Sequence, residues 1–288
     1  MPTNGAAPNL QKESLLILTI RAALKASDAI MGIYQTDFTV DYKQDDSPLT
    51  QADEASHAII MQHLQDTGIP VLSEEGKTLP VAERQSWQTL WIVDPLDGTK
   101  EFIKKNGEFT VNIALVANGT PVLGVVYAPD RNRLYFSMQN SGAYLIDDPD
   151  RLKNLARRLT GSEIKLANLI TEAHKLPLAK DKEQTYTIVG SRSHATPELE
   201  QFVTAKRKEF GQVEFIPAGS SLKICLVAEG RADIYPRLGP TMEWDTAAGH
   251  AVAQSAGARI YEYESGEPLT YNKENLLNPW FVVERLTT

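Results

Sequence analysis

Residues 90–104 read LWIVDPLDGTKEFIK, and this stretch passes from an apolar run through two acids into a second amphipathic run. The apolar residues before Asp94 predict a short buried strand. Pro95 favours an extended backbone at the residue before it, and Gly98 permits a sharp turn. A helix can then begin over residues 99–103. The stretch therefore predicts a strand, a turn and a helix in direct succession.

The predicted turn has the chemistry of a metal and anion site. It can direct the Asp94 and Asp97 carboxylates and the Leu96 carbonyl at one point, and such oxygens are the ligands that Mg²⁺ prefers. The free main-chain N–H groups of Gly98 and Thr99 would face an anion at the helix N-terminus. The alternative is an ordinary Pro-Asp-Gly turn with solvated acids.

Three other acids stand at the ends of predicted elements, and each also has a structural explanation. Glu74 follows a short strand and could be a surface acid. Asp245 begins a helix, where a negative charge is favourable in any case. Asp53 completes the run Thr50-Gln51-Ala52-Asp53, which fits a capping box. Carboxylates that converge from several element ends are nevertheless the usual ligands of a hard cation.

The hydrophobic pattern predicts α+β structure in the first half of the chain. Helical spacing predicts helices over residues 10–34 and 50–66, with a loop or hairpin at residues 36–47 between them. Strands at hairpin distances then form a meander, which predicts an antiparallel sheet. The predicted strands are residues 71–73, 90–93, 109–115, 121–128, 133–138 and 143–146.

Strands and helices alternate in the second half, which predicts α/β structure. The predicted strands are residues 186–191, 213–216 and 232–235, and the helices are residues 197–210, 221–229 and 241–256. The charged, ambiguous segment 147–183 contains the expected domain boundary. The expected division is a tail at 1–9, an N-terminal domain with most metal ligands at 10–150, a connecting insertion at 151–183, and a C-terminal domain at 184–288.

Composition narrows the possible partners and the compartment. The formal net charge is −8, so we expect no binding to a nucleic acid duplex, which requires an excess of Lys and Arg. Cys225 is the only cysteine, which excludes an internal disulfide, fits a cytoplasmic setting and suggests a small core residue. Residues 1–9 lack the features of a secretion signal, and the apolar run 15–20 is too short to span a bilayer. We therefore expect no integral membrane segment.

The acids occur in the order of a known motif set, so the chain resembles the lithium-sensitive, magnesium-dependent phosphatase superfamily of inositol monophosphatases and fructose bisphosphatases. That set is an Asp, a Glu-Glu pair, Asp-Pro-(Ile/Leu)-Asp-Gly-Thr, and Trp-Asp. Here these are Asp53, Glu74-Glu75, residues 94–99 and Trp244-Asp245. The resemblance implies a layered αβαβα sandwich with an antiparallel N-terminal sheet and a mixed C-terminal sheet.

Within that superfamily the chain is most similar to bacterial 3′(2′),5′-bisphosphate nucleotidases. The similarity covers roughly residues 10–285 and departs in segment 147–183 and at Glu243, neither of which is a motif position. The segments that carry it are residues 71–75, 94–104, 106–112, 219–223, 226–230 and 244–252.

The resemblance also implies a mechanism. Two or three Mg²⁺ ions would offset the charge of the phosphate, lower the pKa of a bound water and stabilise the leaving oxygen. Asp53 and Thr99 would form the activating pair, with Asp53 accepting the Thr99 hydroxyl hydrogen to orient the water. The implied metal ligands are Glu74, Asp94, Asp97, Asp245 and the Leu96 carbonyl.

The implied substrate is 3′-phosphoadenosine 5′-phosphate (PAP), with its sulfated analogue (PAPS) also considered, and the C-terminal domain at 184–288 is implied to bind the nucleotide. Hydrolysis of its 3′-phosphate would give AMP and phosphate, a role in sulfur assimilation. Lys223 could instead lie on a solvated helix face, and His194 could be a loop residue or a helix cap. The implied substrate contacts are Glu74, Leu96, Asp97, Gly98, Thr99, Ser191, His194, Ser220, Lys223, Arg237 and Asp245.

Two alternative functions remain open on the sequence. The first is inositol monophosphatase activity in the same fold, and the second is a non-catalytic, metal-dependent nucleotide sensor. A sensor could lose its activating pair, whereas Asp53 and Thr99 are both intact here, which favours catalysis. The resemblance further implies inhibition by Li⁺ and a cytoplasmic protein, with a peripheral position on the inner membrane as an alternative. The oligomeric state is left open.

Overall fold

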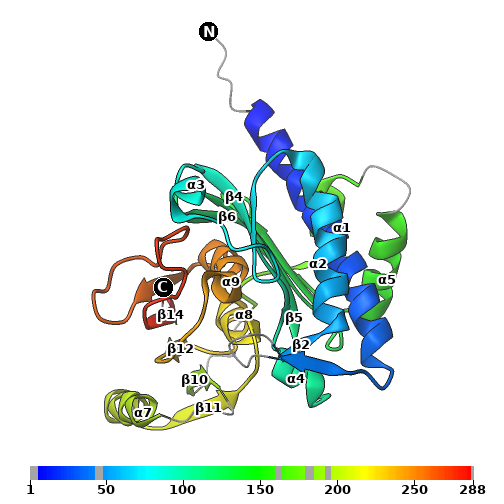
Figure 1. Ribbon diagram of the computed structural model, residues 1–288. Coiled ribbons are helices and arrows are strands. Elements are labelled where there is room, and N and C mark those ends of the chain that lie inside the picture. The colour runs from blue at the N-terminus through cyan, green and yellow to red at the C-terminus, as the bar shows by residue number, and fades with distance from the viewer. Residues whose placement is uncertain (1–5, 43–47, 160–163, 179–184, 192–195, 287–288) are drawn as a thin grey trace.

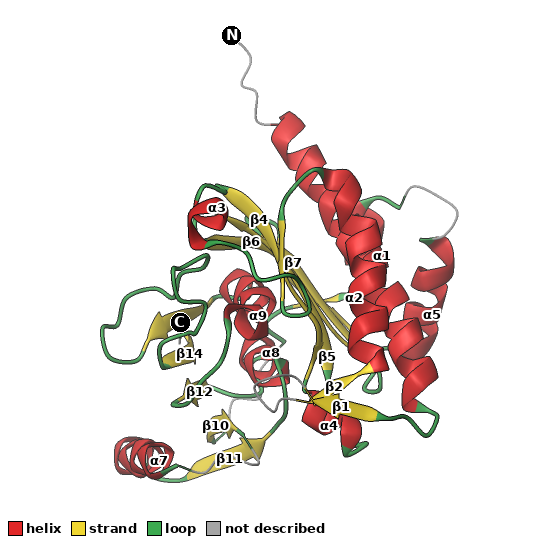
Figure 2. Ribbon diagram, in the orientation of Figure 1, coloured by secondary structure: helices red, strands yellow, loops and turns green. Residues whose placement is uncertain are grey.

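The computed structural model describes residues 6–42, 48–159, 164–178, 185–191 and 196–286 of the chain. Helices and sheets alternate in five layers (Figures 1 and 2), which confirms the predicted αβαβα sandwich. None of the helices in the described ranges combines the length and the apolar character that crossing a membrane requires.

Three helical layers enclose the two sheets. An outer layer covers one face of the first sheet, a central pair separates the sheets, and one helix packs on the second sheet. The outer layer is α1 (Ala6–Tyr34) and α2 (Gln51–Leu64), with α5 (Pro149–Arg158) against α1. The central pair is α8 (Leu222–Glu229) and α9 (Glu243–Ser255), and the last layer is α7 (Pro197–Phe210).

The first sheet has seven strands in the order β3-β4-β5-β6-β7-β8-β9. Its neighbours pair antiparallel, as predicted, except for the parallel pair β3–β4 at one edge. The strands are β3 (Val71–Ser73), β4 (Thr89–Asp97), β5 (Thr110–Ala117), β6 (Thr120–Ala128), β7 (Arg133–Met138), β8 (Gly142–Ile146) and β9 (His174–Lys175).

The second sheet has the order β11-β10-β12-β14-β13 and is mixed, as predicted. The first three strands are parallel, and β14 pairs antiparallel with both of its neighbours. The sequence analysis did not predict its last two strands. The strands are β10 (Tyr186–Gly190), β11 (Val213–Pro217), β12 (Ile234–Arg237), β13 (Ala258–Glu262) and β14 (Phe281–Arg285).

Strand β4 is longer than predicted, because it continues through Pro95 to Asp97 instead of ending at Val93. β3 pairs with β4 only as far as Val93, so the missing N–H of Pro95 removes no hydrogen bond from that edge. On the other edge, the register with β5 shifts between Asp94 and Asp97, which is a β-bulge. The acidic turn is therefore the bulged end of a strand.

Several shorter elements surround these layers. β1 (Val40–Tyr42) pairs antiparallel with β2 (Pro48–Thr50), which lies beyond the residues 36–47 considered for a loop or hairpin, and α4 (Thr99–Ile103) has the predicted bounds. The sequence analysis missed α3 (Val81–Gln85), and the 3₁₀ turn η1 (Gln65–Thr67) follows α2. In the expected connecting insertion, α6 (Leu166–Thr171) follows α5, and β9 pairs with β8 of the first sheet.

Apolar side chains fill both faces of the first sheet. One core lies against α1 and α2 and includes Trp91 and Phe136. A second core lies between the sheets around α8 and α9 and includes Tyr135 and Cys225, which is fully buried as the sequence analysis suggested. The ends of β3 and β4 and the starts of α8 and α9 meet at the edge of this second core.

Candidate active site

Three carboxylates from distant parts of the chain converge at this edge. Oxygen atoms of Glu74, Asp94 and Asp245 all lie within 4.8 Å of one another. They come from the end of β3, from β4 and from the first turn of α9. The structure therefore brings together three of the predicted metal ligands.

The crowded acids raise one another's pKa. Asp94 is 1% exposed, and burial raises its pKa well above the usual range, with Glu74 and Asp97 adding to the rise. Enclosure in the protein raises the pKa of Asp245 to about 8, with the Asp97 carboxylate as the next cause. A bound divalent cation would offset this repulsion, and the donor set consists of the hard oxygen ligands that Mg²⁺ prefers. The residues present therefore fit such an ion.

Asp97 is held where the two halves of the chain meet. Its Oδ2 accepts from the Ser221 N–H at 2.6 Å, from Asn112 Nδ2 at 3.3 Å and from the Thr110 hydroxyl at 3.4 Å. The Ser221 hydroxyl also donates to the Asp245 carbonyl at 2.6 Å. Ser221, just before α8, therefore ties the bulged end of β4 to the start of α9.

Asp53 makes both of the contacts considered for it, one to the capping residue Thr50 and one to Thr99. Its Oδ2 accepts from the main-chain N–H of Thr50 at 2.8 Å and from the Thr50 hydroxyl at 2.6 Å, which caps α2. Its Oδ1 accepts from the Thr99 hydroxyl at 3.3 Å, and that hydroxyl lies 3.4 Å from the Leu96 carbonyl. The predicted pair is thus in contact, and its acid is fixed by the helix that it caps.

Gly98 is required by a close approach between the two halves. Its φ of 91° is in the left-handed region, and a Cβ atom there would lie 2.1 Å from the Ser220 hydroxyl. That hydroxyl is 2.9 Å from the Asp97 carbonyl and 2.7 Å from the Glu108 carbonyl. A side chain at position 98 would therefore separate the acidic turn from the loop before α8.

A pocket extends from the acids toward the second sheet, and most of the other predicted substrate residues line it. Its lining includes Asp97, Asp245, Gly98, Ser191, Ser220, Lys223 and Arg237, whereas Glu74 and Asp94 do not line it. Leu96 and Thr99 lie beside it on the bulge and on α4, and His194 lies outside the described residues.

Lys223 is buried at 8% exposure, so the alternative of a solvated helix face is wrong. Its Nζ donates to the Ser220 carbonyl at 2.7 Å. Burial lowers its pKa to about 8, and the nearby Asp97 opposes that shift. Arg237 donates through Nη2 to the Pro240 carbonyl at 2.7 Å, and its buried Nε has no hydrogen-bond partner among the described residues. The pocket therefore carries two cations, Lys223 and Arg237, which we call its basic wall.

The sequence analysis missed several residues of this site. Glu101 and Tyr235 line the pocket, and burial raises the pKa of Glu101. The spacing of Glu101, one helical turn from Gly98, could have indicated that it faces the pocket. The partners of Asp97 on β5 and before α8 are separated from it by up to 124 residues, so no local pattern reveals them.

Comparison with known proteins places the chain among phosphatases. Residues 11–282 match the family described as the Inositol monophosphatase family. The chain is 45% identical over 267 residues to the 3′(2′),5′-bisphosphate nucleotidase CysQ of Shigella flexneri, covering 91% of this chain and 96% of that protein. Identity to the protein of the same name from Haemophilus influenzae is 34% over 275 residues, covering 94% and 93%.

Solved structures agree with this placement. A crystal structure of CysQ from Bacteroides thetaiotaomicron is 51% identical, has a TM-score of 0.86, and covers 96% of this chain and 98% of that one. The IMPase of Thermotoga maritima is 21% identical, with a TM-score of 0.66 and coverage of 92% and 89%, and shares the fold.

Proposed function

The chain belongs to the inositol monophosphatase family, and from that membership we propose that it hydrolyses the 3′-phosphate of PAP to give AMP and phosphate. At the coarser level it is a 3′(2′),5′-bisphosphate nucleotidase, a phosphatase, as its relatives at 45% identity are. The observation that carries the proposal is a pocket lined by Asp97 and Asp245 together with Lys223 and Arg237, with Asp245 shared with the cluster of converging carboxylates. Such a pocket suits a substrate with two phosphates.

Mg²⁺ is the proposed cofactor, in two or three ions. Glu74, Asp94 and Asp245 would hold it, together with Asp97 and the Leu96 carbonyl. When bound, the ions would offset the phosphate charge and lower the pKa of water. The proposal is supported by the raised pKa of Asp94, since buried acids this close repel one another without a counter-charge.

Asp53 and Thr99 are the proposed activating pair. Asp53 accepts a hydrogen bond from the Thr99 hydroxyl. The oxygen lone pairs of Thr99 are therefore left to accept a hydrogen bond from an attacking water. The Gly98 and Thr99 N–H groups lie at the start of α4, where they can donate to the phosphate. Because water attacks directly, no phosphorylated enzyme forms.

We assign the second phosphate and the nucleoside to the basic wall of the pocket. Lys223 and Arg237 supply positive charge there, and Ser191 and Ser220 line the same pocket. The same contacts admit PAPS, whose 5′-substituent is also anionic. A role in sulfur assimilation and a cytoplasmic location, with or without peripheral attachment to the inner membrane, are part of this proposal.

The decisive experiment is phosphate release from PAP, PAPS and inositol 1-phosphate, each with Mg²⁺ and with EDTA. We expect turnover of PAP that requires Mg²⁺ and is inhibited by millimolar Li⁺. Much faster turnover of inositol 1-phosphate would replace the proposed substrate. Binding of PAP without any phosphate release would instead favour the nucleotide sensor.

A further inference from the structure

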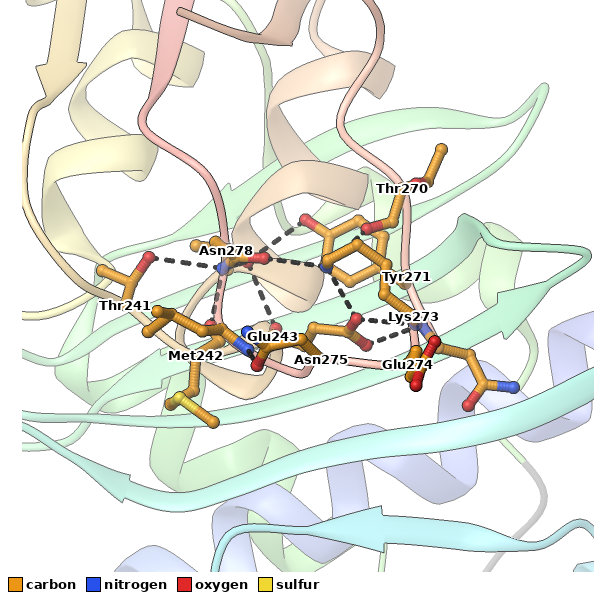
Figure 3. A network of polar contacts seen from close by, with 12 residues as sticks. Thr241, Met242, Glu243, Thr270, Tyr271, Lys273, Glu274, Asn275 and Asn278 are labelled. Atoms are coloured by element: carbon orange, nitrogen blue, oxygen red, sulfur yellow. Dashed lines mark hydrogen bonds and ion pairs between the residues drawn. The ribbon is translucent and has the colours of Figure 1, made fainter. Parts of the chain in front are cut away.

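A loop near the C-terminus forms hydrogen bonds with two segments near the proposed metal ligands. One is the chain that follows Glu74, and the other is the start of α9, which carries Asp245. The loop is residues 271–278, between β13 and β14, and is called the bracket here. Figure 3 shows it beside the N-terminus of α9, with Glu243, Lys273 and Asn278 directed toward one another. None of these residues lines the pocket.

Glu243, the first residue of α9, is the main contact between that helix and the bracket. Its side chain is fully buried, and its carboxylate accepts from the Asn272 N–H at 2.6 Å, the Lys273 N–H at 3.0 Å and Lys273 Nζ at 2.7 Å. The Glu243 N–H donates to the Leu276 carbonyl at 3.0 Å. A buried carboxylate is costly unless donors surround it, so these contacts hold the start of α9 in one place.

A short relay connects the bracket to the Asp245 carboxylate. Asn278 Nδ2 donates to the Met242 carbonyl at 2.8 Å, and the Met242 N–H donates to Asp245 Oδ2 at 2.8 Å. The Asn278 N–H also donates to the Thr241 carbonyl at 2.8 Å. The residue that orients Asp245 is therefore itself fixed by the bracket.

The other end of the bracket is tied to the segment that follows Glu74. Arg84 of α3 is 3% exposed and donates to the carbonyls of Lys273 and Glu274, the latter at 2.5 Å. Asn272 Nδ2 returns a hydrogen bond to the Arg84 carbonyl at 2.7 Å. The bracket thus spans from the chain after β3 to the start of α9.

We infer that Glu243 is a positioning residue for metal binding, which acts through the bracket to set where Asp245 lies relative to Glu74 and Asp94. The inference rests on the proposed function, in which those three acids are metal ligands. Residues that hold a ligand's orientation typically change metal affinity by about 10–100-fold when replaced. A residue that only stabilised the fold would leave the affinity of the folded protein unchanged.

The test is Mn²⁺ affinity, measured by electron paramagnetic resonance on folded, metal-free protein, because it needs no turnover. In Glu243→Gln, which keeps the shape of the side chain and loses its charge, we expect Mn²⁺ binding to weaken by at least about tenfold. The matched control is Glu229→Gln. Glu229 is also fully buried and paired, with Arg133 at 2.8 Å, but it ends α8 at a distance from the acids. Wild-type affinity in Glu243→Gln, or an equal loss in both variants, would overturn the inference.

Two further variants complete the test. Lys273→Met removes the ion pair from a side chain that is 22% exposed, so it tests the bracket if Glu243→Gln does not fold. We expect weaker Mn²⁺ binding, and wild-type affinity would overturn the inference.

Asp245→Asn tests the proposed function separately. If it binds Mn²⁺ as the wild type does, the proposed metal site is wrong, whereas loss in Asp245→Asn with no loss in Glu243→Gln refutes the inference alone.

Discussion

The acidic wall and the basic wall differ in how their charged groups are compensated in the free protein. The acidic wall is formed by the clustered acids, of which Asp245 lines the pocket and Asp94 does not; burial and the neighbouring carboxylates raise the pKa of both. On the basic wall, Lys223 and Arg237 donate to main-chain carbonyls. A carbonyl can be exchanged for a phosphate oxygen without leaving a buried charge unpaired, whereas crowded carboxylates require added positive charge.

The two walls therefore affect the stability of the free protein differently. Without bound cations, the carboxylates of the acidic wall lower the free energy of unfolding. Their presence therefore reduces stability in the metal-free protein. On the basic wall, burial lowers the pKa of Lys223 to about 8, but both cations donate hydrogen bonds to main-chain carbonyls in the free protein. Replacing a residue of the acidic wall should therefore change activity and stability in opposite directions, and replacing one of the basic wall should change substrate recognition.

Asp94→Asn is expected to have the largest effect. The amide can still accept from the Leu96 N–H, which is 3.0 Å from Asp94 Oδ1, but it is a weaker metal ligand. We expect phosphate release from PAP to fall by at least about 10³-fold, since a metal ligand contributes several kcal/mol to the transition state. In EDTA at neutral pH, the thermal midpoint should rise, because the amide carries no charge and so removes both the burial penalty and the repulsion that raise the pKa of Asp94.

The control for this prediction is Glu83→Gln, which removes a carboxylate from the first turn of α3, outside the pocket. It should leave both turnover and the midpoint in EDTA close to the wild-type values. If Asp94→Asn lowered the midpoint in EDTA, the acidic wall would be a stabilising network and the comparison of the two walls would fail.

The sequence was informative where local chemistry decides structure. Gly98 and Pro95 indicated the acidic turn, and α4 has its predicted bounds. The predicted end of β4 was wrong because its pairing with β5 continues past Val93 to Asp97, which only the assembled sheet reveals. The bracket could not be predicted, because Arg84 and Asn272 are 188 residues apart and neither belongs to a periodic pattern.

Lys223→Met tests the basic wall and should have an intermediate effect. Loss of a hydrogen bond to a charged group should reduce kcat/KM for PAP by about tenfold. The lysine pKa is lowered to about 8, so its charge is present below that pH and is lost as the pH rises through it. In the wild type, the ratio of kcat/KM for PAP to that for adenosine 3′-phosphate should therefore fall above about pH 8.

The ratio isolates the second phosphate, because both substrates present the same 3′-phosphate to the acidic wall. In Lys223→Met it should be low and independent of pH. A ratio that kept its pH dependence in the variant would assign the titration to another group and remove Lys223 from recognition of the second phosphate.

The last prediction concerns stability alone, with no expected change in turnover, and separates the acidic wall from the helix that supports it. His250 of α9 is 5% exposed, contacts the Tyr271 hydroxyl at 3.0 Å, and has a pKa lowered by burial to about 4. Below pH 6.5 the unfolded chain binds the proton that the folded protein excludes, so stability falls as the pH drops from 6.5 to 4, by about 3 kcal/mol. Asp245 acts oppositely in metal-free protein: its pKa of about 8 means that stability rises as the pH falls from 8 toward 4.

The two contributions can be distinguished by unfolding in urea with EDTA between pH 8 and pH 4. In the wild type, the gain from the acids should be offset by His250 below about pH 6.5. His250→Asn keeps a polar atom near Tyr271 and removes the titration, so the difference between variant and wild type should narrow or reverse in favour of the variant toward pH 4. Parallel curves would show that His250 is not the source of the loss, and a wild-type curve that fell steadily from pH 8 would contradict the repulsion on the acidic wall. Adding Mg²⁺ should suppress the contribution of the acids and leave that of His250, because only the acids lie where the cations would bind.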